Sequence, residues 1–336
     1  MSTKSLLDWG RKAVPNLASL LWLTFAGTSV KEARRLGLRV ARFRGDRPAA
    51  LTFTFDDGFP REAEEALALL EGYGFRGTFF ANPGPTYDRP EEGGNRLSWA
   101  RWREVLELGH EVGNHSLNHT RLHELDDKAL DREVNQAFHI MTEKLGVPPF
   151  TFCCPGGTRK TDRVLAKIRE HHQTYRDREF VYGGSRWSPA IADKWVDDAI
   201  RWRSWIVPMF HGISEGYDHF PCVDDLYRHL QYIKDREDQI WVDTFGRITR
   251  YIRERDSAHL AARAKGEGVI IKLTTSLDPD LYDEPLTVIV PVSGVVDAAA
   301  SREGEKKPLP VEFDRERILL EVRPGEAPVS LAWRRR

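Results

Sequence analysis

Between residues 50 and 255, short apolar runs alternate with segments of helical periodicity. Residues 50–55 and 77–81 are apolar runs bounded by turn residues, so they predict strands. Residues 60–71 repeat alanine and leucine at helical spacing and are followed by two glycines, so they predict a helix. Such alternation is typical of βα units around a parallel sheet. Further strands are expected at 110–114, 150–154, 179–182, 205–210 and 240–244, and further helices at 99–108, 127–145, 162–170, 224–237 and 245–255.

After residue 256 the pattern changes, because strand-like runs follow one another with Asp-Pro, Pro and Gly turns between them. This pattern predicts a small β-sandwich-like domain at 257–336. Its role is interpreted as covering one flank of the first domain rather than binding sugar, since no aromatic cluster stands out in it. The runs lie at 269–274, 286–290, 318–322 and 330–333.

The first 47 residues form a third region, with an apolar run at 18–27 that follows Lys4, Arg11 and Lys12. The run is too short to span a bilayer, so no transmembrane segment is expected. It is either a weak signal-like segment or part of an N-terminal helix that packs on the domain. The protein is therefore expected in the cytoplasm or exported through this weak signal.

Composition narrows the function classes. The 336 residues carry a formal net charge of -1, so there is no overall electrostatic attraction to nucleic acid or to an anionic membrane. Three cysteines do not form a disulfide framework, and reduced thiols favour the cytoplasm.

Chemistry concentrates at the ends of the predicted strands. Asp56 and Asp57 directly follow the first strand, and His115 and His119 follow the strand at 110–114. Two adjacent carboxylates repel each other, and a bound metal ion relieves that repulsion. One carboxylate with two imidazoles is a metal-ligand set with positions left open for water, which suits Zn²⁺ or another divalent ion such as Co²⁺, Ni²⁺ or Mn²⁺. The second carboxylate is then available as a base.

These motifs, with a later Met209-Phe210-His211-Gly212, resemble the signature motifs of polysaccharide deacetylases of the NodB-homology type, the carbohydrate esterase family 4-like proteins. The resemblance covers roughly residues 48 to 255, and its motifs occur in the order of the family. It implies a distorted (β/α) barrel at 48–256 and a metal-dependent hydrolase that removes N- or O-linked acetyl groups from an acetylated glycan.

The resemblance also implies a role for each site residue. Asp57, His115 and His119 would bind the metal, and Asp56 would be the general base. His211 would be the general acid, a role that suits a side chain whose pKa lies near neutrality. The amide of Gly156, which follows the proline of the third motif, would stabilise the oxyanion. His123 continues the histidine spacing but lies outside the family pattern and is not assigned to the metal.

The sequence departs from the family at Cys153, where many members carry an arginine that pairs with the base. No clear fourth motif appears, although Asp193, Asp197 and Asp198 lie in the corresponding region. The sequence therefore predicts an apolar surrounding for Asp56 with a raised pKa, and a packing role for Cys153. Two alternatives stay open, an amidohydrolase of a small cyclic or linear amide on the same fold and a non-catalytic glycan-binding protein.

Overall fold

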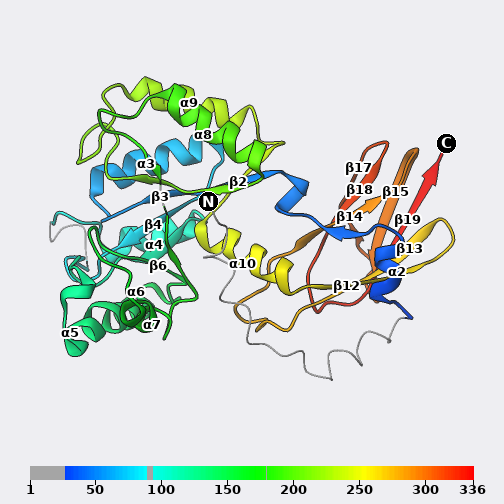
Figure 1. Ribbon diagram of the computed structural model, residues 1–336, viewed down its shortest axis with the longest axis horizontal. Coiled ribbons are helices and arrows are strands. Elements are labelled where there is room, and N and C mark those ends of the chain that lie inside the picture. Colours follow the sequence, from blue (N-terminus) through cyan, green and yellow to red (C-terminus); the bar gives the residue numbers. More distant parts are fainter. Residues whose placement is uncertain (1–26, 89–93, 179) are drawn as a thin grey trace. The chain divides into compact units, whose positions relative to one another are not determined.

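The computed structural model describes residues 27–88, 94–178 and 180–336 (Figure 1). These residues form two compact units, one of residues 48–248 and one that joins residues 27–47 to residues 249–336. The boundary falls within helix α10 (Phe245–Ser257). The expected three-part division remains a prediction. The expected signal-like or helical run at 18–27 lies almost entirely outside the described residues, which begin at Gly27.

A parallel sheet forms the centre of the unit 48–248. Seven strands are hydrogen-bonded in the order β7-β6-β5-β4-β3-β10-β8, and every pairing in this sheet is parallel. The expectation of an α/β fold with a parallel sheet is confirmed. The sheet is curled but ends at β7 and β8, so it is an open half-barrel. Its strands are β3 (Phe53–Phe55), β4 (Gly77–Ala81), β5 (Glu111–Asn114), β6 (Thr151–Cys153), β7 (Thr174–Arg176), β8 (Phe180–Val181) and β10 (Pro208–Phe210).

A second parallel sheet continues two of these strands in the N-terminal direction. Its order is β11-β2-β9, with β11 at Ile240–Val242, β2 at Ala49–Leu51 and β9 at Trp205–Ile206. Single residues separate β2 from β3 and β9 from β10, so each chain segment passes from one sheet into the other.

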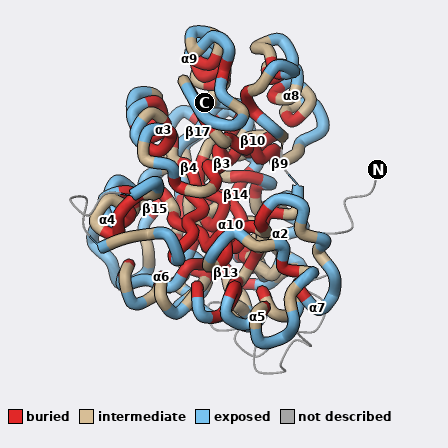
Figure 2. The backbone as a smooth tube through the Cα atoms, turned by 90° about the vertical axis from the view of Figure 1, so that its left-hand side faces the viewer, coloured by how far each residue is buried: buried red, intermediate tan, exposed pale blue. Residues whose placement is uncertain are grey.

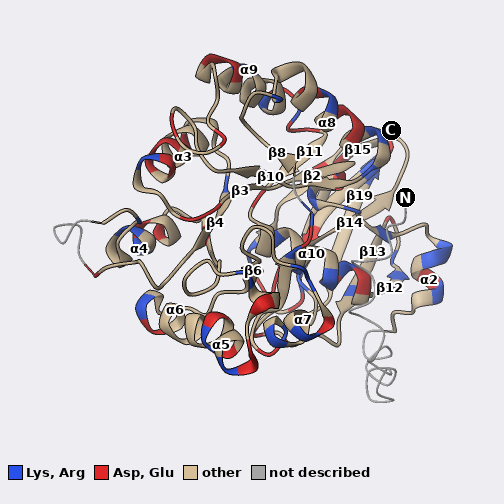
Figure 3. Cartoon of the chain, turned by 60° about the vertical axis from the view of Figure 1, so that its left-hand side comes forward, with Lys and Arg blue, Asp and Glu red and all other residues tan. Residues whose placement is uncertain are grey.

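Helices surround these strands. All residues of β3, β4 and β10 are buried (Figure 2), which is typical of parallel strands covered on both faces. Charged residues instead concentrate on the helices (Figure 3). The helices are α3 (Pro60–Tyr73), α4 (Trp99–Glu107), α5 (Asp127–Asp131), α6 (Ala137–Leu145), α7 (Asp162–Ile168), α8 (Pro189–Trp202) and α9 (Val223–Lys234).

The helix predicted at 127–145 is present but is not uniform. Between α5 and α6 the segment Arg132–Gln136 forms a π-helical turn, labelled η5.

Helix α3 begins at a proline and ends at Gly74, whose φ of 70° is left-handed and suits glycine. Ser98 caps the start of α4, because its side chain accepts a hydrogen bond from the amide of Arg101.

The second unit consists mainly of two antiparallel sheets. One has the order β1-β14-β18-β17 and the other β12-β13-β19-β15-β16. In β18, buried positions alternate with partly exposed ones, which is typical of a sheet with one covered face. Its elements are α2 (Val30–Arg35), β1 (Arg39–Val40), β12 (His259–Ala264), β13 (Gly268–Thr274), β14 (Leu286–Pro291), β15 (Val295–Arg302), β16 (Pro308–Leu309), β17 (Val311–Phe313), β18 (Arg317–Val322) and β19 (Val329–Arg335).

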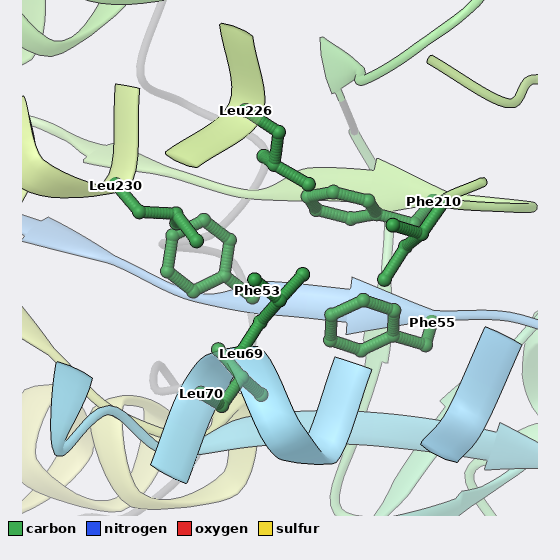
Figure 4. A pocket seen from close by; sticks show the side chains of 8 residues that line it. Phe53, Phe55, Leu69, Leu70, Phe210, Leu226 and Leu230 are labelled. Carbon is green, nitrogen blue, oxygen red and sulfur yellow. The ribbon is translucent and has the colours of Figure 1, made fainter. Parts of the chain in front are cut away.

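A small apolar cavity lies on the helix-facing side of β3 and β10 (Figure 4). Side chains alternate across a strand, so Phe53 and Phe55 face this cavity while Thr54 faces the other way, toward Pro208. The cavity is therefore a gap in the core. It is lined by Phe53, Phe55, Leu69, Leu70, Phe210, Ile213, Leu226 and Leu230.

None of the helices in the described ranges has the length and apolar character needed to cross a membrane.

Candidate active site

The candidate site lies at the carboxyl ends of the parallel strands. Asp56 follows β3, His115 follows β5, and His211 follows β10. Cys153 and Arg176 are the last residues of β6 and β7. Parallel strands present their carboxyl ends at one edge of a sheet, so residues distant in sequence meet there.

Asp57, His115 and His119 lie close together at this edge. One possible ligand atom from each lies within 4.8 Å of the others. Asp57 Oδ1 is 3.9 Å from His115 Nε2 and 3.5 Å from His119 Nε2. Asp57 Oδ1 and His115 Nε2 are buried and have no hydrogen-bond partner among the described residues. A divalent cation would satisfy both atoms, so this donor set fits the metal implied by the family resemblance.

The main chain helps to hold these side chains in place. His115 Nδ1 lies 2.9 Å from the carbonyl oxygen of Cys153, so Nδ1 carries the proton and Nε2 keeps its lone pair. Burial lowers the pKa of His115 despite the opposing charges of Asp56 and Asp57, which favours the neutral, ligating form. Asp57 and His119 have left-handed φ values of 70° and 60°.

The loop between the two histidines packs on the π turn described above. The carboxylate of Glu133 accepts hydrogen bonds from the amide and from the side-chain nitrogen of Asn118, both at 2.9 Å. The carbonyl of Glu133 accepts a hydrogen bond from the amide of Leu117. A π turn displaces the helix surface locally, and here it places Glu133 against the residues that precede His119.

Asp56 is paired with an arginine that the sequence analysis missed. Arg176 Nη1 donates to Asp56 Oδ1 at 2.8 Å, and Nη2 donates to Oδ2 at 2.5 Å. Nη1 also donates to the hydroxyl of Thr54 at 2.8 Å. Both Asp56 and Arg176 are buried, so the two residues form a bidentate ion pair that is shielded from solvent.

This pairing corrects the expectation of an apolar surrounding for Asp56. Burial raises the pKa of Asp56, but Arg176, His115 and His211 outweigh burial and hold the pKa below its usual value. The predicted rise in this pKa was therefore wrong. The sulfur of Cys153 lies 3.9 Å from Asp56 Oδ2. The arginine expected two residues before the proline of the third motif thus comes from the neighbouring strand β7.

A second combination of potential ligands consists of Asp56, His115 and Cys153. Arg176 already occupies both carboxylate oxygens of Asp56. A cation at that position would face the guanidinium across the same carboxylate. The set that contains Asp57 is therefore the better metal site.

His211 lies on the other side of Asp56. Its Nε2 is 3.7 Å from Asp56 Oδ2, and its Nδ1 is 3.2 Å from Asp218 Oδ2. Asp218 therefore orients the imidazole. Sequence reasoning missed Asp218, although its spacing of seven residues after His211 within one loop was a usable signal.

The remaining predicted residues lie as follows. Gly156 is exposed in the loop after β6, with open space around its Cα. His123 Nδ1 accepts a hydrogen bond from the amide of Arg159, and His123 belongs to neither of the two potential ligand sets. The three aspartates considered for a fourth motif lie on α8: Asp193 pairs with His229, Asp197 with Tyr232 and Asp198 with Lys194.

Comparison with known proteins identifies related sequences. Residues 44–175 match the family described as polysaccharide deacetylase. A gellan lyase from a Bacillus species is 26% identical over 332 residues, an alignment that covers 87% of this chain. The chain corresponds to only 13% of the length of that relative.

Solved structures with a similar arrangement include peptidoglycan deacetylase PdaC from Bacillus subtilis, at 18% identity and a TM-score of 0.44 over 64% of this chain and 96% of the other. A family 4 carbohydrate esterase from Streptomyces lividans in complex with acetate has 15% identity and a TM-score of 0.41 over 58% and 92%. A mutant of a family 4 pseudoenzyme has 14% identity and a TM-score of 0.44 over 63% and 70%.

Proposed function

We propose that this protein is a metal-dependent hydrolase that removes acetyl groups from a carbohydrate, a proposal supported by the match of residues 44–175 to the polysaccharide deacetylase family. The observation that carries the proposal is the convergence of Asp57, His115 and His119 beside an ionised Asp56. Zn²⁺ suits this oxygen and nitrogen donor set, and Co²⁺, Ni²⁺ and Mn²⁺ are the other candidates.

Each residue around the proposed metal then has a separate role in the proposed reaction. A bound divalent ion would polarise the acetyl carbonyl and lower the pKa of water. Asp56 accepts a proton from the attacking water, and Arg176 keeps Asp56 ionised beforehand. His211 donates a proton to the leaving oxygen or nitrogen, with Asp218 accepting from its other ring nitrogen. The amide of Gly156 is proposed as the oxyanion donor.

The two alternatives predict different results. A non-catalytic glycan-binding protein has no need of Asp56, Asp57, His115, His119 and His211 together, and this chain retains all five. An amidohydrolase of small amides would use the same residues and differ in substrate. The match of residues 44–175 to the polysaccharide deacetylase family supports the carbohydrate activity, so it is the function proposed.

Acetate release tests the proposal. Chelated protein and protein reloaded with zinc are incubated with acetylated xylan, chitin oligomers and peptidoglycan. We expect release from at least one carbohydrate, and only after reloading. No release from any carbohydrate, together with hydrolysis of small amides, would replace the proposal with the amidohydrolase alternative.

Metal analysis tests the ligand assignment separately. Asp57→Ala and His119→Ala should each lose the bound ion, because a three-ligand site does not survive removal of one ligand. Asp56→Asn should keep the ion and lose about 10²–10⁴-fold in turnover, the usual range for a missing general base. His123→Ala is the matched control and should keep both the ion and the activity. Loss of the ion in Asp56→Asn alone would reverse the assigned roles of the two aspartates.

A further inference from the structure

Tyr217 has an unusual position beside the candidate site. It is 89% exposed, compared with 67% for Trp202 on α8. Its ring centroid lies 6.1 Å from that of His211, with the two planes at 87°. Its amide donates a hydrogen bond to the carbonyl of His211 at 3.1 Å. A large aromatic ring is thus presented to solvent next to the proposed general acid.

The loop of residues 211–220, here the His211 loop, is held closed at its base. Gly212 and Gly216 pair with each other across the loop. Gly216 has a φ of 120°, and a Cβ placed there would lie 2.5 Å from the carbonyl oxygen of His211. Glycine is required at this position, and the tight turn leaves the loop little freedom.

The His211 loop is also fixed to helix α3. Glu65 accepts hydrogen bonds from the amide of Ser214, at 2.9 Å, and from its hydroxyl. Arg61 forms an ion pair with Glu215 at 3.1 Å. These contacts position the loop without using the ring of Tyr217. The ring is therefore not exposed through loop mobility, and it contributes little to holding the loop.

We propose that Tyr217 stacks on the sugar ring that carries the acetyl group, an inference that rests on the proposed function and names a substrate-binding residue for it. The oxygen or nitrogen that leaves during deacetylation is attached directly to that sugar ring. If His211 protonates this atom, the sugar ring lies within a few ångströms of His211, where Tyr217 also lies. A flat aromatic face matches the C–H face of a pyranose, so the contact depends on the ring rather than on the phenol hydroxyl.

Kinetics of Tyr217→Ala and Tyr217→Phe test this proposal on the zinc-loaded full chain. The substrates are acetylated xylo-oligosaccharides, chitin oligomers and ethyl acetate, a small ester without a ring. We expect Tyr217→Ala to raise KM for the carbohydrate substrate about tenfold, the effect of truncating an aromatic anchor. The kcat of Tyr217→Ala and its rate of ethyl acetate hydrolysis should stay within about twofold of wild type. Tyr217→Phe should keep the wild-type KM for the carbohydrate. Trp202→Ala is the matched control and should leave KM unchanged.

An unchanged carbohydrate KM in Tyr217→Ala would overturn the proposal, as would an equal loss with ethyl acetate. Calorimetric binding of the same oligosaccharides to the Asp56→Asn protein separates this inference from the proposed function. If no carbohydrate is deacetylated but binding weakens when Tyr217 becomes alanine, Tyr217 is a sugar-binding residue and the proposed activity is wrong. Absence of oligosaccharide binding before the Tyr217 change would overturn the inference as well.

Discussion

Asp56 is buried, so its charge must be balanced inside the fold. Arg176 supplies that balance through two parallel hydrogen bonds, and it lies 120 positions further along the chain. Breaking a buried pair by removing one partner typically costs about 3–5 kcal/mol, because the remaining charge is left without compensation. At the scale of single residues, the proposed base therefore depends on a guanidinium from a different strand.

Arg176→Met should lower kcat/KM by at least about 100-fold, because the unpaired carboxylate becomes a poorly oriented base with an altered pKa. Arg176→Lys keeps the charge but loses the fork, so an intermediate loss is expected. Metal content should stay unchanged in both variants, since Arg176 is not among the potential ligands. Wild-type kcat/KM in Arg176→Met would show that the ion pair has no role in the reaction.

Cys153→Ala should retain most of the activity. The thiol is buried at the end of β6, and the base is oriented by Arg176. Thiol-blocking reagents should likewise have little direct effect on turnover, which acetate release before and after treatment measures. A loss comparable to that of Asp56→Asn, in a protein that still unfolds at the wild-type temperature, would assign a catalytic role to the thiol.

Residue types and their position after predicted strands indicated that the acidic pair and the two histidines form one candidate site. The pairing of Arg176 with Asp56 was not predictable from the residues around Arg176. In the sheet, β6, β5 and β4 separate β7 from β3. Only the curl of the sheet brings the two strands within reach of one long side chain. Sequence patterns report which face a residue occupies, but they do not report curvature, so a contact across the open half-barrel stays hidden.

At the scale of elements, the π turn and the loop between His115 and His119 together support the proposed metal site. The helix at 127–145 was predictable from its periodicity. Its π turn was not, because the displaced turn is stabilised by partners outside the helix, the backbone and side chain of residues 117 and 118. Outer partners of this kind orient metal ligands and usually change metal affinity when they are removed.

Glu133→Ala should therefore weaken zinc binding about 10–100-fold, and added zinc should restore much of the activity. Zinc titration with a competing chelator measures the affinity. Glu143→Ala, an exposed glutamate on α6, is the matched control and should bind zinc as wild type does. Equal zinc affinity in Glu133→Ala and Glu143→Ala would separate the π turn from the metal site.

At the scale of the whole molecule, the candidate site and the antiparallel sheets belong to different compact units. The four predicted C-terminal runs correspond to β13, β14, β18 and β19. β12 and β15 were missed, because their alanine-rich segments have weak strand propensity and are fixed by pairing with neighbouring strands. Pairing between distant segments also brings β1 beside β14, which the local pattern of residues 39–40 does not indicate.

The unit that contains the antiparallel sheets should lose stability as pH rises from about 4.5 to about 7. Burial raises the pKa of Glu254 from 4.5 to about 7; the hydrogen bond from the amide of Glu284 and the charge of Arg250 oppose the rise, and the charges of Glu284 and Asp283 add to it. The folded state then binds a proton that the unfolded state has released, so stability is full below the unfolded pKa and declines through this range. Each pKa unit corresponds to ~1.4 kcal/mol, so the free energy of unfolding falls by at most about 3.5 kcal/mol over this range.

Thermal unfolding of wild type and Glu254→Gln across this pH range measures the effect. The wild type should become less stable relative to the variant as the pH rises, because glutamine carries no titrating proton. Parallel pH profiles for the two proteins would contradict the prediction.

The left-handed backbone at Asp57 and His119 has a consequence for how such a protein changes under selection. Side chains with a Cβ are disfavoured in this conformation, whereas glycine adopts it freely. Glycine at position 57 would also remove one of two adjacent carboxylates. A population screened for heat resistance alone should therefore accumulate glycine at these two positions and lose the two proposed metal ligands. Laboratory evolution of this protein for heat resistance would have to score the proposed turnover in every round, because the most heat-resistant variants would lack the proposed metal ligands.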